Sequence, residues 1–190
     1  LLGYPARPGD WETALLPARI APYHTSQLDS LAQESGLLWL GCGEKRLTFC
    51  FEEEIDLLRP EEPLGAGGEL PPVVGLFESD HERLALEQLV DRARSSESAL
   101  PTDTTALSGQ LFDAAWQGLV TADGLPALRR SILGGFKVEA PPKARSGSRR
   151  RGFERWRGAR PFGLQFRRLP EPAAADLLEQ QERDRERARI

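Results

Sequence analysis

Two stretches of this chain space their apolar residues as a helix does, and both stretches are short. Apolar residues follow the i, i+3, i+4, i+7 spacing over residues 86–93 and again over residues 112–119. This spacing places the apolar side chains on one face of a helix, so both stretches predict helices that pack against a core. Asp80 and Ser108 are the expected N-caps. Short helices of this kind must share their core with other elements.

Two short apolar runs, residues 37–42 and 47–51, flank the turn sequence Gly43-Glu44-Lys45 and predict a β-hairpin. The side chains expected on one common face of this hairpin are Leu38, Leu40, Cys42, Leu47, Phe49 and Phe51. A helix beginning near Thr25 and ending at Gly36 precedes the hairpin and is expected to pack on it.

The fold class expected from these patterns is α+β, built from winged-helix-like modules in which helices pack on short β-hairpins. The second module combines three helices, a strand near residues 119–122, a long loop and a returning strand at 162–166. The four expected parts are a helix-plus-hairpin module at 1–59, a Pro- and Gly-rich linker at 60–79, a winged-helix-like module at 80–168 and the start of a helical segment at 169–190. The two modules either stand as separate domains or interlock as one body.

The charge of the chain is strongly segregated along the sequence. Residues 1–136 contain 10 Lys and Arg against 21 Asp and Glu, whereas residues 137–168 contain 11 basic residues against only two acids. The overall net charge of −4 therefore conceals a local charge of +9. Such a concentration of positive charge attracts phosphate backbones whatever the net charge of the whole chain.

The residues that carry this charge alternate with aromatic residues in a Gly-, Ser- and Arg-rich loop at 143–160, which we expect to be mobile. The predicted nucleic-acid-binding residues are Lys143, Arg145, Arg149, Arg150, Arg151, Arg155, Trp156, Arg157 and Arg160. Guanidinium groups pair bidentately with phosphates, and an exposed Trp can stack on an unpaired base. The alternative is a solvated linker that only keeps the chain soluble.

Several sequence boxes occur in the order found in Lhr-type (large helicase-related) superfamily 2 helicases, which the chain resembles over nearly its whole length. They are Trp11 with the Leu-Leu-Pro-Ala-Arg-Ile box at 15–20, the Leu-Asp-Ser-Leu helix at 28–31, the Gly-x-x-Trp-x-Gly strand at 36–41, the segment at 111–123 and the Leu-Pro-Ala-Leu-Arg box at 125–129. The sequence departs from the family pattern at Gln117-Gly118, in the short turn at 43–46 and at 163–166, where the family has a Trp.

This resemblance implies that the chain is a C-terminal accessory region of an ATP-dependent 3′-to-5′ DNA helicase linked to DNA repair. The expected partners are single-stranded DNA, or an RNA–DNA hybrid, and the RecA-like motor domains of the same parent chain. ATP and Mg²⁺ are cofactors of the parent, and none is expected in this segment, because no phosphate-binding Gly-x-x-x-x-Gly-Lys-Ser/Thr loop occurs. We expect a cytoplasmic protein with no membrane partner.

The residues offer little for catalysis. Two histidines and two cysteines, without a Cys-x-x-Cys pair, do not have the spacing of a zinc site. Two other functions stay open. One is a purely structural domain that braces the motor. The other is a DNA-glycosylase-like module, for which Glu34, Glu54 and Asp113 are the candidate carboxylates.

Overall fold

The computed structural model describes residues 2–59, 70–80, 82–96, 99–122, 124–136, 138 and 164–170. These residues form an α+β structure with two small antiparallel sheets. In chain order the elements are α1 (Pro8–Asp10), η1 (Trp11–Leu15), α2 (Thr25–Ser35), β1 (Leu38–Gly41), β2 (Leu47–Cys50), η2 (Glu52–Glu54), α3 (Ile55–Leu58), η3 (Pro72–Leu76), β3 (Arg83–Ala85), α4 (Leu86–Ser95), α5 (Thr104–Trp116), β4 (Val120–Ala122), α6 (Leu125–Leu133) and β5 (Gln165–Arg168).

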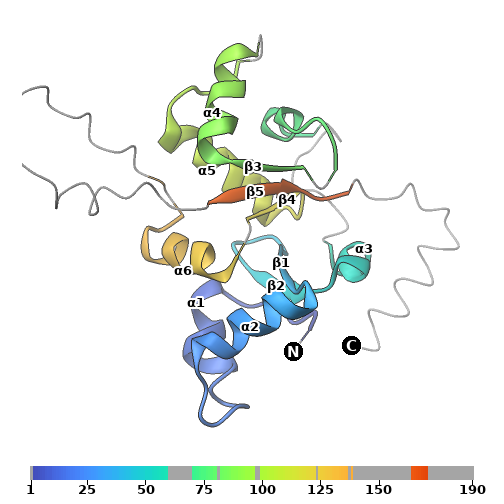
Figure 1. The fold of residues 1–190 in the computed structure, drawn as a ribbon, viewed down its shortest axis with the longest axis vertical. Helices are drawn as coiled ribbons and strands as arrows, with labels where there is room; N and C mark the ends of the chain where they lie inside the picture. The colour runs from blue at the N-terminus through green and yellow to red at the C-terminus, as the bar shows by residue number, and fades with distance from the viewer. Residues whose placement is uncertain are drawn as a thin grey trace, which may run out of the picture.

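The three-stranded sheet crosses the middle of the molecule in the order β3-β5-β4 (Figure 1). Helix α4 lies on one side of it, and the β1-β2 hairpin lies on the other side together with α1 and α2. Strand β5 is last in sequence but central in the sheet, pairing antiparallel with both neighbours. The sheet is therefore complete only when the chain has returned from the segment after α6.

The two predicted helix faces are confirmed, but their caps are not. Leu86, Leu89, Val90 and Ala93 of α4 are all buried, as the apolar period indicates. Helix α4 begins at Leu86, too far from Asp80 for a cap, and the side chain of its own Gln88 accepts from the Ala85 N–H. Asp80 therefore cannot be the N-cap of α4, because it lies too far from Leu86 along the chain.

Helix α5 is longer than predicted, and this changes its cap. It begins at Thr104, and the Asp103 carboxylate accepts from the Ala106 N–H as its N-cap. Ser108 lies inside the helix, where its hydroxyl donates to the Thr105 carbonyl. The predicted Ser108 cap is wrong because one continuous helix begins four residues earlier.

The hairpin strands form where expected, but the predicted face is wrong. Cys42 pairs with Arg46 across a turn of three residues, so Leu38 lies opposite Cys50 and Trp39 opposite Phe49. Residues that are opposite one another in an antiparallel pair share a face. Trp39 and Phe49 therefore share one face, and the other face carries Leu38. The predicted face combined residues from opposite sides of the sheet, which is the result of a one-residue error in register.

The expected linker at 60–79 is partly a core element. Residues 72–76 form η3, in which Val73, Val74 and Leu76 are buried in the main hydrophobic cluster. Two prolines at its start fix the backbone for a tight turn and do not prevent burial. Residues 60–69 lie outside the described part of the chain. One continuous core includes buried residues from both expected modules, from Trp11 to Phe166.

The hairpin and the second module are joined at Trp39. The Trp39 indole N–H donates to the Ala122 carbonyl at 2.8 Å, and the Thr121 hydroxyl donates to the Trp39 carbonyl at 2.8 Å. The Trp39 ring also lies 6.0 Å from the Trp116 ring of α5. Both tryptophans are buried.

Next to Trp39, the backbones of β1 and α5 lie so close together that β1 requires a glycine. A Cβ atom on Gly41 would lie 1.9 Å from the Ala115 carbonyl oxygen and 2.6 Å from the Trp116 Cα. The Gly43 N–H donates to the Trp116 carbonyl at 2.8 Å, so the backbone of α5 cannot move away without loss of this bond. Gly109, also in α5, has no atom within 4 Å of its corresponding position.

These two glycines predict opposite effects of the same substitution. Gly41→Ala should lower the free energy of unfolding by about 3 kcal/mol or more, the upper range for overpacking. Gly109→Ala should raise it by roughly 0.5–1 kcal/mol, because alanine is the better helix former at an uncrowded site. Urea denaturation followed by circular dichroism measures both. A neutral Gly41→Ala variant would contradict the close packing of β1 on α5.

Candidate nucleic-acid interface

The predicted nucleic-acid-binding residues, from Lys143 to Arg160, all lie outside the described part of the chain. The structure does describe the residues on either side of them. Val138 is held on α5, where its carbonyl accepts from Thr105 Oγ1 at 2.9 Å and its N–H donates to Ser108 Oγ. On the other side, the Leu164 carbonyl accepts from the N–H of Leu86 at the start of α4. The core therefore fixes the residues that flank the basic segment, which we define as residues 139–163.

Both ends of the basic segment also pack against one aromatic side chain of α5. Phe136 and Phe166 lie on either side of it in sequence, and their rings are 5.3 and 5.4 Å from the ring of Phe112, each edge to face. Phe136 also contacts Trp116 at 4.7 Å. Edge-to-face aromatic pairs add to the energy of apolar burial. The basic segment therefore leaves and re-enters the fold at the same cluster on α5.

The surface of α5 itself lacks positive charge. Most of the helix is buried, and its exposed polar side chains are Gln110 and Asp113. A recognition helix that reads bases in a major groove normally presents cationic or amide side chains to the DNA. The α5 surface does not provide such a cationic face.

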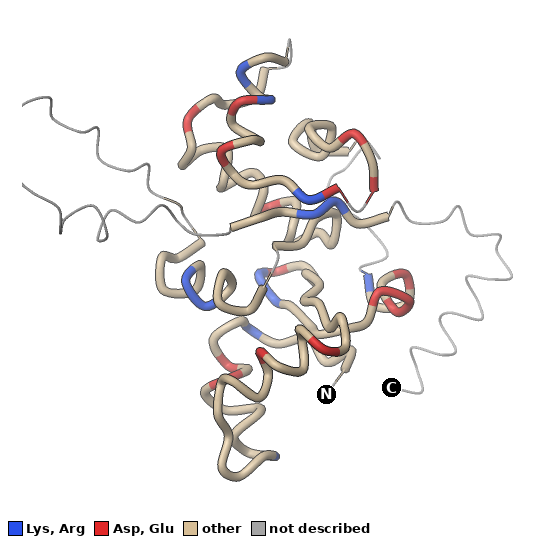
Figure 2. Tube along the Cα trace, viewed as in Figure 1, with Lys and Arg blue, Asp and Glu red and all other residues tan. Residues whose placement is uncertain are grey.

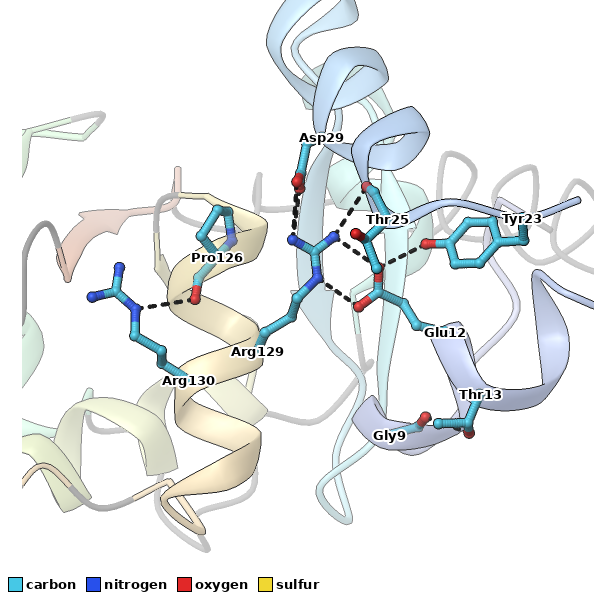
Figure 3. Close-up of polar contacts among 9 residues, drawn as sticks. All are labelled: Gly9, Glu12, Thr13, Tyr23, Thr25, Asp29, Pro126, Arg129 and Arg130. Carbon is cyan, nitrogen blue, oxygen red and sulfur yellow. Dashed lines mark hydrogen bonds and ion pairs between the residues drawn. The ribbon is translucent and has the colours of Figure 1, made fainter.

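An ion-pair network fixes α6 to the N-terminal helices (Figure 3). The Arg129 guanidinium binds Glu12 through Nε at 2.6 Å and Nη2 at 2.7 Å, and it binds both oxygens of Asp29 through Nη1. The Tyr23 hydroxyl donates to Glu12 at 2.6 Å. Arg129 thus joins three segments that are far apart in sequence. It is the last residue of the box at 125–129, but the sequence did not indicate these partners.

The network shifts the pKa values of its members in directions that match these contacts. Burial would raise the pKa of Glu12, but the hydrogen bonds from Arg129 and Tyr23 outweigh burial and lower it. Burial, together with the bond to Glu12, raises the pKa of the Tyr23 hydroxyl. The bond to Glu12 raises the pKa of Arg129 despite burial. All three groups therefore keep their ordinary charge at neutral pH.

The cysteines show no sign of a reactive thiol. Burial raises the pKa of Cys42 to about 11 and that of Cys50 to about 12, so both thiols are protonated at neutral pH. A protonated, buried thiol is a poor nucleophile and a poor metal ligand. Within the described residues, no group of three or more His, Cys, Asp and Glu side chains could hold a metal ion.

A cleft of about 400 Å³ lies between α2, β1, the start of α6 and the three-stranded sheet. Its polar lining includes Gln33, Glu52, Arg83, Thr121 and Arg167. The carboxylates considered for glycosylase chemistry, Glu34, Glu54 and Asp113, do not line it. Glu54 instead accepts from the N–H of Phe51 and ends the turn after β2. Sequence reasoning missed Arg83 and Arg167, because only the register of β3 with β5 places them together.

In the described part of the chain, no helix combines the length and the apolar content needed to cross a bilayer.

The Arg129 network predicts a stability difference that depends on pH. Arg129→Met should lower the free energy of unfolding at pH 7 by roughly 2–4 kcal/mol, because two partly buried carboxylates lose their partner. The folded-state pKa of Glu12 is lowered, so its stabilising effect is present above about pH 4.5 and is lost as the pH falls through the folded pKa. The difference between wild type and variant should therefore shrink in acid.

Arg130→Met is the matched control, because Arg130 is the next residue of α6 and is exposed. It should change the free energy of unfolding by less than about 0.5 kcal/mol. Chemical denaturation at pH 7 and at pH 3 measures these differences. Equal losses in the two variants would show that the network has no special role.

A scan of protein-family models finds none that matches this chain, and a search of curated proteins finds no significant match either. The resemblance to Lhr-type helicases therefore rests on the sequence boxes and their order, and the function that it implies is a proposal.

Proposed function

We propose that this chain is an accessory DNA-binding and bracing region of an Lhr-type ATP-dependent 3′-to-5′ DNA helicase. In this proposal the basic segment contacts single-stranded DNA, and the folded body rests against the RecA-like motor domains of the same parent. ATP and Mg²⁺ act in the motor, so the chain by itself does not hydrolyse ATP. The basis is the ordered set of sequence boxes together with the segregation of charge.

The observation that carries the DNA-binding part is the anchoring of both ends of the basic segment on Phe112. Residues 137–168 hold a charge of +9, while the preceding 136 residues hold −11. A phosphate backbone is attracted by the former and repelled by the latter. Because the residues on both sides of the basic segment are held on the same aromatic cluster, the anchoring favours a defined strand path over a solvated linker.

The order of the elements supports a winged-helix-like module. Residues 72–170 run helical turn, strand, helix, helix, strand, helix and strand, with the last strand between the other two. Apart from the additional helix α6 between the last two strands, this order resembles that of a winged helix in which η3, α4 and α5 are the three helices. Helix α6 and the basic segment then stand where the wing would be. Because α5 lacks cations, the wing position is the better candidate for DNA contact than the recognition helix.

The test is fluorescence-anisotropy binding of single-stranded DNA over a salt series, with Arg149, Arg150, Arg151 and Arg155 present or all changed to Ala. Each phosphate contact on a single strand contributes roughly 0.7 to the slope of log K against log salt. Removal of four contacts should therefore reduce the slope by about 3 and weaken binding at low salt.

The matched control changes Arg183, Arg185, Arg187 and Arg189 to Ala, which removes the same charge from a stretch of residues, 169–190, with a net charge of −2. This variant should keep most of the affinity and nearly the full salt slope. Equal weakening in the two variants would indicate general charge attraction. Absence of binding in all three proteins would favour the purely bracing role, with DNA held by the motor.

A further inference from the structure

Helix α6 ends in an apolar side chain that is almost fully exposed. Leu133 is the last residue of the helix, and 88% of its surface is exposed. The next most exposed large apolar residue among those that the structure describes is Tyr4, at 53%. A leucine in water does not gain the free energy of burial, so a complex in which a partner covers it is stabilised by the contact. Leu133 is therefore the apolar side chain of the described body that is most available to a partner.

The backbone around Leu133 is fixed by hydrogen bonds that close the helix. The Gly135 N–H donates to the Ile132 carbonyl at 3.2 Å. The Phe136 N–H donates to the Ser131 carbonyl at 2.7 Å, and Gly135 adopts the left-handed conformation with a φ of 63°. These two bonds and the left-handed glycine form a Schellman motif, which satisfies the last carbonyls of a helix. Leu133 thus projects from a closed helix end and not from a loop.

Phe136 holds the same helix end on the core. Its own φ of 59° is also left-handed, a conformation that is strained for an aromatic residue. The ring packs edge to face on Phe112 at 5.3 Å and on Trp116 at 4.7 Å, and these contacts hold Phe136 in this conformation. Strained residues of this kind are concentrated at functional sites. The position of Leu133 is therefore set by the core as well as by the helix.

Helix α6 has an inner side and an outer side. Arg129 on the inner side is bound by two carboxylates, whereas Arg130 points away from them (Figure 3). Pro126, Arg130 and Leu133 are exposed and follow the spacing i, i+4, i+7, so they form one stripe along the outer side. The helix contains no Asp or Glu, whereas Figure 2 shows acidic residues on α2 and α4. The outer side of α6 itself therefore presents no carboxylate.

The strongest positive charge of the chain follows this stripe directly in sequence. Residues 137–168 hold a charge of +9, and they begin four residues after Leu133. Phe136 and Phe166, on either side of the basic segment, meet at Phe112. A phosphate-bearing ligand that binds the basic segment is therefore tethered at the helix end that carries Leu133.

A ligand with both phosphates and apolar surface fits this combination. Nucleic acid provides both, because its phosphates bind cations and its bases present flat faces that side chains can cover. Stacking covers the base faces inside an intact duplex, and they become accessible where the two strands separate. Apolar side chains, leucine among them, insert between bases in several classes of DNA complex and unstack them. Leu133 therefore fits the last base pair at a junction between single- and double-stranded DNA.

We propose that Leu133 is an apolar wedge that packs on the last base pair at such a junction, while the basic segment binds the phosphates of the single strand. This role rests on the proposed function, and it names the DNA structure that the chain recognises. A second copy of the chain could also cover Leu133. A symmetric contact of this kind would bring two segments of charge +9 together, and their repulsion disfavours it.

The test uses a forked DNA with 2-aminopurine in the last base pair before the fork, because the fluorescence of this base rises when it is unstacked. Wild-type protein at saturating concentration should raise the fluorescence several-fold at this position and little at a position in the middle of the duplex. Saturation is judged from the fluorescence anisotropy of the same DNA labelled at its far end. Contact with the last base pair is thereby measured separately from affinity.

Leu133→Ala should remove most of this rise and lower the preference for the fork over single-stranded DNA about tenfold, because the carbons that cover the base pair are lost. Leu133→Met keeps the apolar volume and should retain the rise. Leu31→Ala is the matched control, because Leu31 lies on α2 and is 49% exposed, and it should behave as wild type does. Both leucines are exposed, so the variants should fold, which circular dichroism checks.

The variant with Arg149, Arg150, Arg151 and Arg155 changed to Ala separates this role from the proposed function. It should need more protein to reach saturation, but its fluorescence rise at saturation should remain. Salt-dependent binding of single-stranded DNA by wild type, together with an undiminished rise in Leu133→Ala, would overturn the wedge and leave the proposed function intact. Absence of DNA binding by wild type would overturn both.

Sedimentation velocity tests the second copy as the partner of Leu133. The wild-type chain and Leu133→Ala should both sediment as monomers. A wild-type dimer that dissociates in Leu133→Ala would assign Leu133 to a contact between copies and would overturn the wedge.

Discussion

The packing of the hairpin against the second sheet depends on the contacts between Trp39 and β4. Two hydrogen bonds, one from the indole to Ala122 and one from Thr121 to the Trp39 carbonyl, connect the hairpin to the edge of the second sheet. Gly41 then allows the α5 backbone to approach β1 without a side chain between them. Because these hydrogen bonds pair buried side-chain donors with backbone carbonyls, neither half can shift without leaving buried polar groups unpaired.

The basic segment and the cleft differ in their charged residues. In the proposed function the basic segment contacts DNA through many charges of similar kind, and such contacts are individually weak and strongly dependent on salt. In the cleft, strand register places the buried Arg167 opposite the exposed Arg83. The Arg129 network connects these regions, because α6 supplies one wall of the cleft and leads directly into the basic segment. Movement of α6 would therefore affect both.

Local features could be predicted from the sequence, and long-range pairings could not. The apolar periods identify the buried faces of α4 and α5, and Gly36 ends α2 in the left-handed conformation expected of it. The face of the hairpin was wrong because one residue of register reverses every side chain. Residues 72–76 fall within the predicted linker because proline and glycine content does not reveal burial. The pairing of Arg83 with Arg167 depends on strands separated by most of the second module. The predicted DNA-binding residues themselves lie outside the described chain.

The central position of β5 in the sheet affects how far the length of the basic segment can change. The chain leaves the sheet at Ala122 and returns at Gln165, so the segment closes a long loop within one sheet. The entropy of loop closure grows only with the logarithm of length, and doubling a long flexible loop costs about 0.6 kcal/mol. Insertions and deletions between Val138 and Leu164 should therefore leave the fold nearly as stable, provided that both ends remain packed on Phe112. On this argument, we expect the same folded body to accept basic segments of different length.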